Sequence, residues 1–158
     1  MSHQIDVDAA AVRVPVARRR VREIALAVLR GEGVHDARLS ITFVSARRMA
    51  VLNERHLRHH GPTDVISFAL GTRGGPLLGD IYIAPDVARR NAREHGASLG
   101  EEITRLVVHG VLHVLGYDHP EGKGRDSSPM WRRQEALVAS LARRATAARR
   151  TRLTRSAA

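Results

Sequence analysis

The sequence contains no cysteine, few aromatic residues and no long apolar run. The absence of cysteine excludes disulfides, thiolate zinc ligands and cysteine nucleophiles, and it is compatible with a reducing cytosol. Aromatic residues make up only 3% of the chain, so its core must be built from aliphatic side chains. No apolar run approaches the ~20 residues of a membrane span, and the N-terminus lacks the basic start and apolar segment of a signal peptide. We therefore expect a soluble cytoplasmic protein with no membrane partner.

Lysine is also nearly missing, because all but one of the 26 basic residues are arginine. With 16 acidic residues, the formal net charge is +10. Codon usage in a GC-rich genome would explain the choice of arginine over lysine, but it would not explain the net charge. A basic surface attracts polyanions, and arginine both forms bidentate hydrogen bonds with phosphate groups and stacks on bases. The composition therefore favours a nucleic acid as partner.

Three histidines, His109, His113 and His119, follow the pattern H-x-x-x-H-x-x-G-x-x-H. On a helix, residues four apart lie on one face, one turn from each other. Gly116 stands where a left-handed turn at a helix end favours glycine, so the chain can reverse and bring His119 towards the first pair. Three unrelated histidines on a buried helix and its exit loop would be the alternative, but the spacing argues against it.

Three imidazoles are a typical ligand set of a catalytic zinc site, which leaves the fourth position open to water. The pattern therefore predicts a site for one zinc ion, and nickel or another divalent ion is an alternative occupant. The metzincin peptidases share this spacing, but they carry H-E-x-x-H and use the Glu as general base. Position 110 is Gly here, so we expect the same ligand geometry to serve another chemistry.

The sequence of this stretch, H-G-x-L-H-x-x-G-Y-D-H, resembles the signature of the YbeY-type endoribonucleases, bacterial factors linked to ribosomal RNA maturation. Two further segments fit the same family. Residues 61–68 are similar to its P-T-D-V-L-S-F motif, and residues 78–83 are similar to its L-G-D-I-x-I motif. Order and separations also agree, so the resemblance covers about residues 36 to 140.

The resemblance implies a mixed sheet with helices packed on it and a metal ion in a surface cleft. It implies a zinc-dependent single-strand endoribonuclease that acts in the processing of the 16S rRNA 3′ end and in ribosome quality control. It also implies work with the small ribosomal subunit and its proteins.

The chain departs from the family pattern at one place. The family commonly has an aromatic residue and then an arginine three and four residues after its Leu-Asn pair. Here Leu52-Asn53 is followed by His56 and Leu57, and Arg58 comes one place later. Arg58 is therefore the candidate for the family's functional arginine. His59 and His60 in the same loop are candidate extra ligands, although a solvated loop is the preferred interpretation.

Periodicity and turn residues predict the secondary structure. Apolar residues at helical spacing follow Pro15, which can open a helix at its first turn. Ser45 is expected to cap a second helix, and Ser98 and Glu101 match the capping box that would open the histidine helix. We expect helices at about 15–30, 46–57, 85–95, 98–115 and from 129, strands at 37–44, 65–70 and 78–84 with the last two forming an antiparallel hairpin, and a short edge strand within 4–14.

These elements indicate an α+β fold: a single domain with a small mixed sheet of about four strands, about five helices, and the metal site at a helix C-terminus and its following loop. We expect a metal-dependent ribonuclease-like domain over residues 1–142. Residues 143–158 are rich in arginine and alanine and form a basic C-terminal tail, either a fraying helix end or a disordered segment.

Three other residues near the motifs have open interpretations. Asp118 either orients a histidine ligand or shapes the turn after Gly116. Tyr117 is interpreted as packing rather than catalysis. Asp80, inside the strand at 78–84, is expected to face solvent or cap a neighbour, and a role near the metal is the alternative.

A zinc ion with an open position lowers the pKa of bound water to near 7, so hydroxide forms even without a Glu base. We therefore expect metal-assisted cleavage of phosphodiesters. Two alternatives remain: a metal-dependent hydrolase of peptides or small molecules, and a non-catalytic RNA-binding factor of ribosome assembly with a structural zinc.

Overall fold

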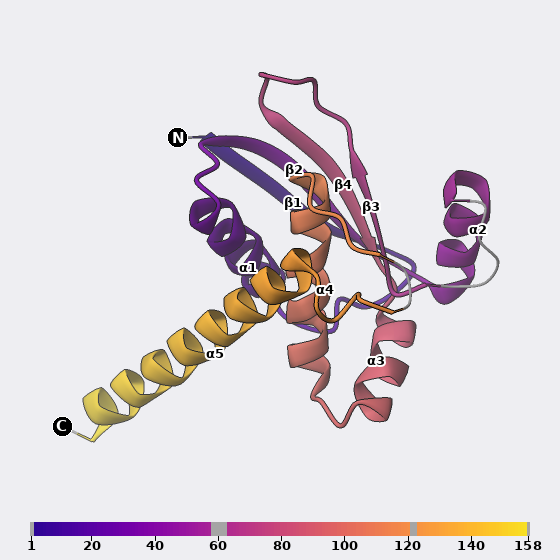
Figure 1. The fold of residues 1–158 in the computed structure, drawn as a ribbon. Coiled ribbons are helices and arrows are strands. Elements are labelled where there is room, and N and C mark those ends of the chain that lie inside the picture. Colours follow the sequence, from indigo (N-terminus) through magenta and orange to yellow (C-terminus); the bar gives the residue numbers. More distant parts are fainter. Residues whose placement is uncertain (1, 58–62, 121–122, 158) are drawn as a thin grey trace. The chain divides into compact units, whose positions relative to one another are not determined.

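A computed structural model describes residues 2–57, 63–120 and 123–157. The elements follow one another in the order of Figure 1: β1 (Ser2–Ala10), α1 (Arg18–Gly31), β2 (Asp36–Val44), α2 (Ala46–Leu57), β3 (Val65–Ala69), β4 (Leu77–Ile83), α3 (Pro85–Glu94), α4 (Leu99–Val114) and α5 (Pro129–Ser156). The chain divides into two compact units, Met1–Asp118 and His119–Ala158. The described part therefore has the four strands and five helices that the sequence predicts.

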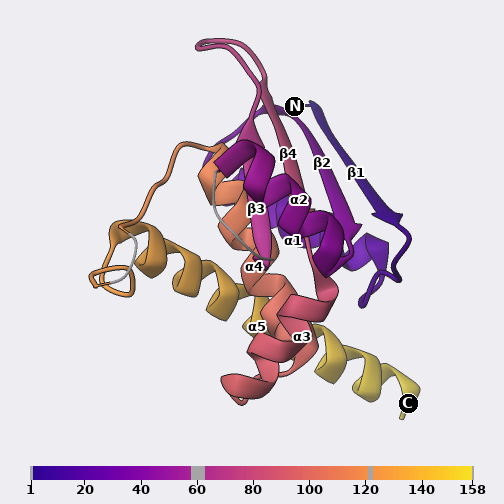
Figure 2. The ribbon, with the colours of Figure 1, turned by 90° about the vertical axis from the view of Figure 1, so that its right-hand side faces the viewer.

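The four strands form one mixed sheet in the order β1-β2-β4-β3. β1 lies at one edge and pairs in parallel with β2, which pairs in parallel with β4. β3 pairs with β4 in antiparallel fashion, which confirms the predicted hairpin. The connection between these two strands reaches beyond the ends of the neighbouring strands in both views (Figures 1 and 2).

One face of the sheet carries α4. Gly79 and Ile81 of β4 approach this helix at Val114 and Gly110. Their register partners on β2 are Leu39 and Ile41, both buried as the alternation of that strand predicts. α1 contacts α4 and β1, and α3 contacts α4. α4 is therefore the central helix of the first unit, and the side chains on its sheet-facing side are held in place by β3 and β4.

The opposite face of the sheet is covered in part by α2. Met49 and Leu52 of this helix are buried with Ile66 of β3, and Phe68 and Tyr82 pack against the same cluster. Figure 2 shows α2 in front of the strands. Because side chains alternate between the faces, Ile66 and Phe68 point to α2, and Ser67 between them points to α4.

Side-chain caps fix the beginnings of three helices. The hydroxyl oxygens of Ser45, Ser98 and Ser128 accept hydrogen bonds from backbone N–H groups three residues later, at 3.1–3.2 Å. The predicted start of the first helix at Pro15 is wrong, because α1 begins at Arg18. Residues 11–17 are used instead for the turn that leads from β1 into the helix.

The second unit is dominated by α5, which runs without interruption for 28 residues. Its first half carries a buried stripe at helical spacing, made of Met130, Gln134, Leu137, Val138 and Leu141. Every residue from 142 to 157 is exposed. Within the described residues, no helix combines the length and the apolar character needed to cross a bilayer.

Candidate metal centre

α4 ends in a turn that reverses the chain shortly after the second histidine. Gly116 has φ 103°, the left-handed conformation that glycine adopts most readily. Its N–H donates to the carbonyl of His113 at 3.0 Å, and the N–H of Tyr117 donates to the carbonyl of Leu112 at 3.0 Å. These two bonds define a Schellman motif, which satisfies the last helical carbonyls while the chain turns back.

The three histidines of the sequence motif come together at this turn. Each offers a ring nitrogen, and these nitrogens all lie within 4.8 Å of one another. His109 is buried at 8% exposure, and the other two are half-buried. The rings of His109 and His113 meet edge to face with centroids 4.6 Å apart, as residues one helical turn apart can. Within the described residues, this is the group of side chains able to hold a metal ion.

The hydrogen bonds of the rings suit metal binding. The Nδ1 of His113 lies 3.0 Å from the carbonyl oxygen of Tyr117, and the Nδ1 of His119 lies 3.1 Å from that of Pro120. A carbonyl can only accept, so in the neutral imidazole each Nδ1 carries the proton and each Nε2 presents its lone pair. Backbone carbonyls often hold metal-binding histidines in this way. In their neutral form, two of the three imidazoles therefore have an Nε2 lone pair that can bind a divalent ion.

A second hydrogen bond anchors the residue that orients His113. The hydroxyl of Tyr117 donates to the carboxylate of Glu32 at 2.8 Å, although the two residues are 85 positions apart. Glu32 follows the last residue of α1 as its C-cap. Side chain and carbonyl of Tyr117 thus connect the end of α1 to a candidate ligand. Sequence reasoning missed this role of Glu32, because no local pattern pairs residues so far apart.

Gly110, between the two helical histidines, is where α4 comes closest to the sheet. A Cβ added at this position would lie 2.8 Å from Cγ2 of Ile81 and 3.2 Å from Oγ of Ser67. The Ser67 hydroxyl also donates to the carbonyl of Gly110 at 3.2 Å. Any side chain here would collide with β3 and β4, so the Glu that peptidases of this spacing use has no space at this position.

The other candidate residues lie in different surroundings. Asp80 stands on the face of the sheet opposite α4, and its carboxylate accepts a hydrogen bond from Ser40 at 3.1 Å. It therefore bonds to the side chain of its cross-strand partner on β2. Asp118 is exposed and directly precedes His119. The predictions for Arg58, His59 and His60 concern positions outside the described residues.

Two turns before His109, α4 carries a buried carboxyl group, that of Glu102. Burial raises the pKa of Glu102 above its ordinary value of 4.5, and the nearby carboxylate of Asp64 raises it further. Asp64 at the start of β3 also accepts a hydrogen bond from Asn91 of α3 at 3.1 Å. These contacts join β3, α3 and α4 near the beginning of the histidine helix.

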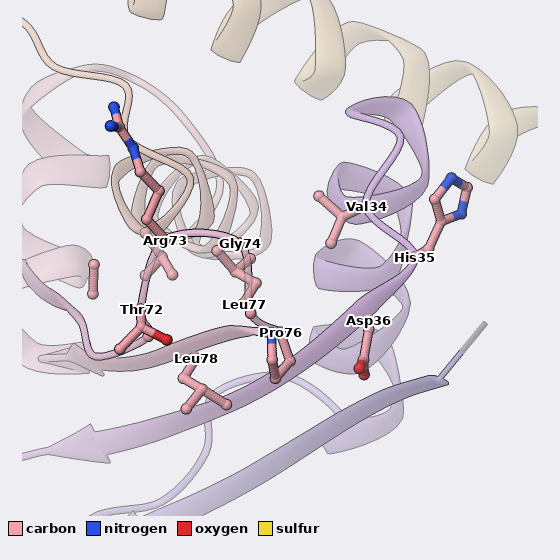
Figure 3. A pocket seen from close by; sticks show the side chains of 13 residues that line it. Val34, His35, Asp36, Thr72, Arg73, Gly74, Pro76, Leu77 and Leu78 are labelled. Atoms are coloured by element: carbon pink, nitrogen blue, oxygen red, sulfur yellow. The ribbon is translucent and has the colours of Figure 1, made fainter.

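A pocket of about 650 Å³ lies at the β3–β4 connection (Figure 3). Val114 of α4 lines it beside Leu77 and Leu78, but the three histidines are not among its described lining residues. Figure 3 shows the guanidinium of Arg73 directed away from the ring of His35. The charged side chains that line the pocket do not converge, so the pocket is not a second candidate for the metal site.

A helical histidine pair, a glycine turn and a third histidine define a three-histidine group that could bind a metal ion and that lacks the peptidase Glu. Comparison with known proteins names the family. The family model described as Endoribonuclease YbeY matches residues 4–142, and the chain belongs to this family.

Individual relatives agree with this assignment. The protein named Endoribonuclease YbeY from Aquifex aeolicus is 39% identical over 139 residues, which cover 82% of this chain and 89% of the relative. A relative of the same name from Anaeromyxobacter sp. is 41% identical over 124 residues, which cover 77% of this chain and 64% of the relative. The solution structure of TM1509 from Thermotoga maritima superposes with a TM-score of 0.60 at 26% identity, covering 85% of this chain and 87% of that one.

Proposed function

We propose that this protein is a zinc-dependent endoribonuclease that cleaves single-stranded RNA. The observation that carries the proposal is the convergence of His109, His113 and His119 in a chain that belongs to a family described as endoribonucleases. The relatives from Aquifex aeolicus and Anaeromyxobacter sp. bear the same name. A net charge of +10 suits a polyanionic substrate.

In this proposal the three histidines hold one zinc ion. A zinc ion bound there would supply a water of lowered pKa and would polarise a phosphoryl oxygen. The carbonyl of Tyr117 keeps the His113 ring in its orientation, and Glu32 keeps Tyr117 in place. Asp118 either orients a histidine or shapes the turn, and both roles remain part of the proposal. Imidazole donors also suit nickel and other divalent ions, so the bound metal must be identified by elemental analysis of the purified protein.

Positive side chains complete the proposed site. Arg58 is the arginine that we propose for contact with the scissile phosphate, since it follows the α2 helix one place after the family's usual position. Such a contact would offset the charge that develops on the phosphate during cleavage. Gly110 leaves no side chain to act as base at the position of the peptidase Glu.

The proposed biological substrate is ribosomal RNA. The resemblance of the three sequence motifs supports a function in the maturation of the 16S rRNA 3′ end and in ribosome quality control. Such a function implies contact with the small ribosomal subunit and its proteins, and it would place the protein in the cytoplasm.

The experiment that tests this proposal measures cleavage of end-labelled RNA by the wild type and by His113→Ala, each purified free of other nucleases and analysed for bound metal. His35→Ala, which removes an exposed histidine outside the cluster, is the matched control. We expect the wild type and His35→Ala to cut single-stranded RNA faster than duplex RNA, and His113→Ala to lose both metal and cleavage.

Other outcomes point to the alternative functions. A wild type that holds one zinc ion and binds RNA without cutting it would support a ribosome-assembly factor with a structural metal. Cleavage of a peptide library without cleavage of RNA would support a hydrolase of another substrate class. Equal cutting by the wild type and His113→Ala would mean that the activity does not arise at the three histidines.

A further inference from the structure

The last part of α5, residues 143–156, differs in composition from every other described helix. It contains six arginines and no acidic residue, and all of its residues are exposed. We call residues 143–156 the arginine arm. The arm is helical to Ser156 and follows the buried stripe of α5, which ends at Leu141. Its arginines are Arg143, Arg144, Arg149, Arg150, Arg152 and Arg155.

Several arginines on α1, α3 and α4 have acidic partners on their own helix. Arg19 pairs with Glu23 on α1 at 3.0 Å. Arg105 pairs with Glu101 on α4 at 2.7 Å. Among the described residues, no ion pair is found for the arginines of the arm, and the last acidic residue of the sequence is Glu135. The positive charge of the arm is therefore not compensated along its own helix.

Helix stability does not explain this arrangement. Arg149, Arg152 and Arg155 follow one another at i,i+3 spacing, and like charges at such spacing destabilise an isolated helix by about 0.2–0.5 kcal/mol per pair. The helix dipole favours cations only within the last turn, where α5 has Arg155. The remaining five arginines gain nothing from it, so a function outside the helix is the better explanation.

The surface of the arm fits a polyanion better than an apolar partner. Leu153, at 66% exposure, is its one large apolar side chain, and an amphipathic helix that enters a membrane or a protein groove needs an apolar face. Arg143 and Arg150, about 10 Å apart along the axis, flank a shallow hollow lined by Ala142, Thr146 and Ala147. These small residues let a backbone phosphate approach both guanidinium groups.

We propose that the arginine arm binds the phosphate backbone of RNA without reading its bases, and so adds affinity that the rest of the protein does not supply. Because the arginines occur on all sides of the helix, the arm suits RNA that bends around it. The family match ends at residue 142, so the arm lies outside the part that the family describes. The inference rests on the proposed function only in taking RNA as the polyanion.

The test is RNA binding by metal-depleted protein, measured by fluorescence anisotropy with a labelled single-stranded RNA between about 50 and 200 mM salt. The arm variant replaces four arginines by glutamine, which keeps helix propensity: Arg149→Gln, Arg150→Gln, Arg152→Gln and Arg155→Gln. The control variant removes the same charge from α1 and α3: Arg19→Gln, Arg30→Gln, Arg89→Gln and Arg93→Gln. Both lower the formal net charge from +10 to +6. A third variant carries lysine at the four arm positions.

Each phosphate contact with single-stranded nucleic acid contributes about 0.7 to the slope of log affinity against log salt. We expect the arm variant to lose about 2 to 3 units of slope and at least about tenfold in affinity, and the control variant to lose less than about 1 unit. The lysine variant is expected to keep the wild-type slope. Circular dichroism checks that all four proteins contain the same helix content.

Equal slopes for the arm and control variants would overturn the inference, because net charge alone would then explain binding. So would loss of binding to phosphatidylglycerol vesicles with RNA binding intact, since the arm would then serve a membrane. Binding is measured without cleavage. A wild type that cuts RNA while the arm variant keeps its slope contradicts this inference alone, and a wild type that binds through the arm but never cuts contradicts the proposed function alone.

Discussion

Replacing Gly110 by alanine tests whether the close approach of α4 to the sheet holds the histidines in place. The new Cβ would lie 2.8 Å from Cγ2 and 3.3 Å from Cδ1 of Ile81, a side chain with no exposed surface. Carbon atoms in good contact are about 3.5–4.0 Å apart, so the helix or the strand must move by several tenths of an ångström. That movement would displace His109 and His113 together.

Two opposing effects decide the size of the change. Overpacking of this kind costs about 1–3 kcal/mol, whereas alanine is favoured over glycine inside a helix by about 1 kcal/mol. The expected net loss of unfolding free energy for Gly110→Ala is therefore about 0–2 kcal/mol. Gly100→Ala in the same helix is the matched control, because its Cβ would meet nothing within 4 Å. It is expected to gain up to about 1 kcal/mol.

The assay is urea unfolding of both metal-depleted variants, followed by titration with zinc. We expect Gly110→Ala to be less stable than Gly100→Ala by about 1–3 kcal/mol and to bind zinc at least about tenfold more weakly, as changes around ligand histidines commonly do. Equal stability and equal zinc affinity of the two variants would refute the reasoning, since the contact with β4 would then have no influence on the site.

Further predictions concern the residues that support the histidines. Tyr117→Phe removes the donor to Glu32; it should cost about 0.5–1.5 kcal/mol of unfolding free energy and weaken zinc binding in a calorimetric titration, and an unchanged zinc affinity would contradict the positioning role. For Glu102, burial and then Asp64 raise the pKa of the folded state above 4.5. The folded protein thus holds this proton more tightly, and its stability falls as pH rises from 4.5 to that raised value. The unfolding free energy of Glu102→Gln should therefore rise relative to that of the wild type as the pH increases from about 4 to about 7. A difference between the two proteins that does not change with pH would oppose this account.

The order of elements could be predicted from the sequence because its signals are local. Alternation in residues 37–44 gave the faces of β2, and Ser45 and Ser98 marked the beginnings of α2 and α4 where the structure has them. The histidine cluster was equally accessible, because helix period and Gly116 together determine where the side chains point. Pro15 does not mark the start of α1, since a proline that is tolerated in the first turn of a helix also fits the linker before the helix.

Other parts of the site depend on long-range packing and have no local signal. The hydrogen bond between Glu32 and Tyr117 requires that α1 and the end of α4 meet. The need for glycine at position 110 arises from the register of β3 and β4 beneath it. The surroundings of Asp80 follow from the side of the sheet on which α4 packs. Each of these facts concerns partners that are distant in sequence.

The central claim is that RNA cleavage depends on one metal ion held by the three histidines. The most direct measurement is titration of zinc into metal-depleted protein, with cleavage of end-labelled single-stranded RNA followed at each addition. The account predicts that activity is absent at first, rises in proportion to added zinc and levels off at one ion per chain, in keeping with a single cluster of ligands in the described residues. Undiminished cleavage by the depleted protein, or equal cleavage by His113→Ala under the same titration, would contradict it.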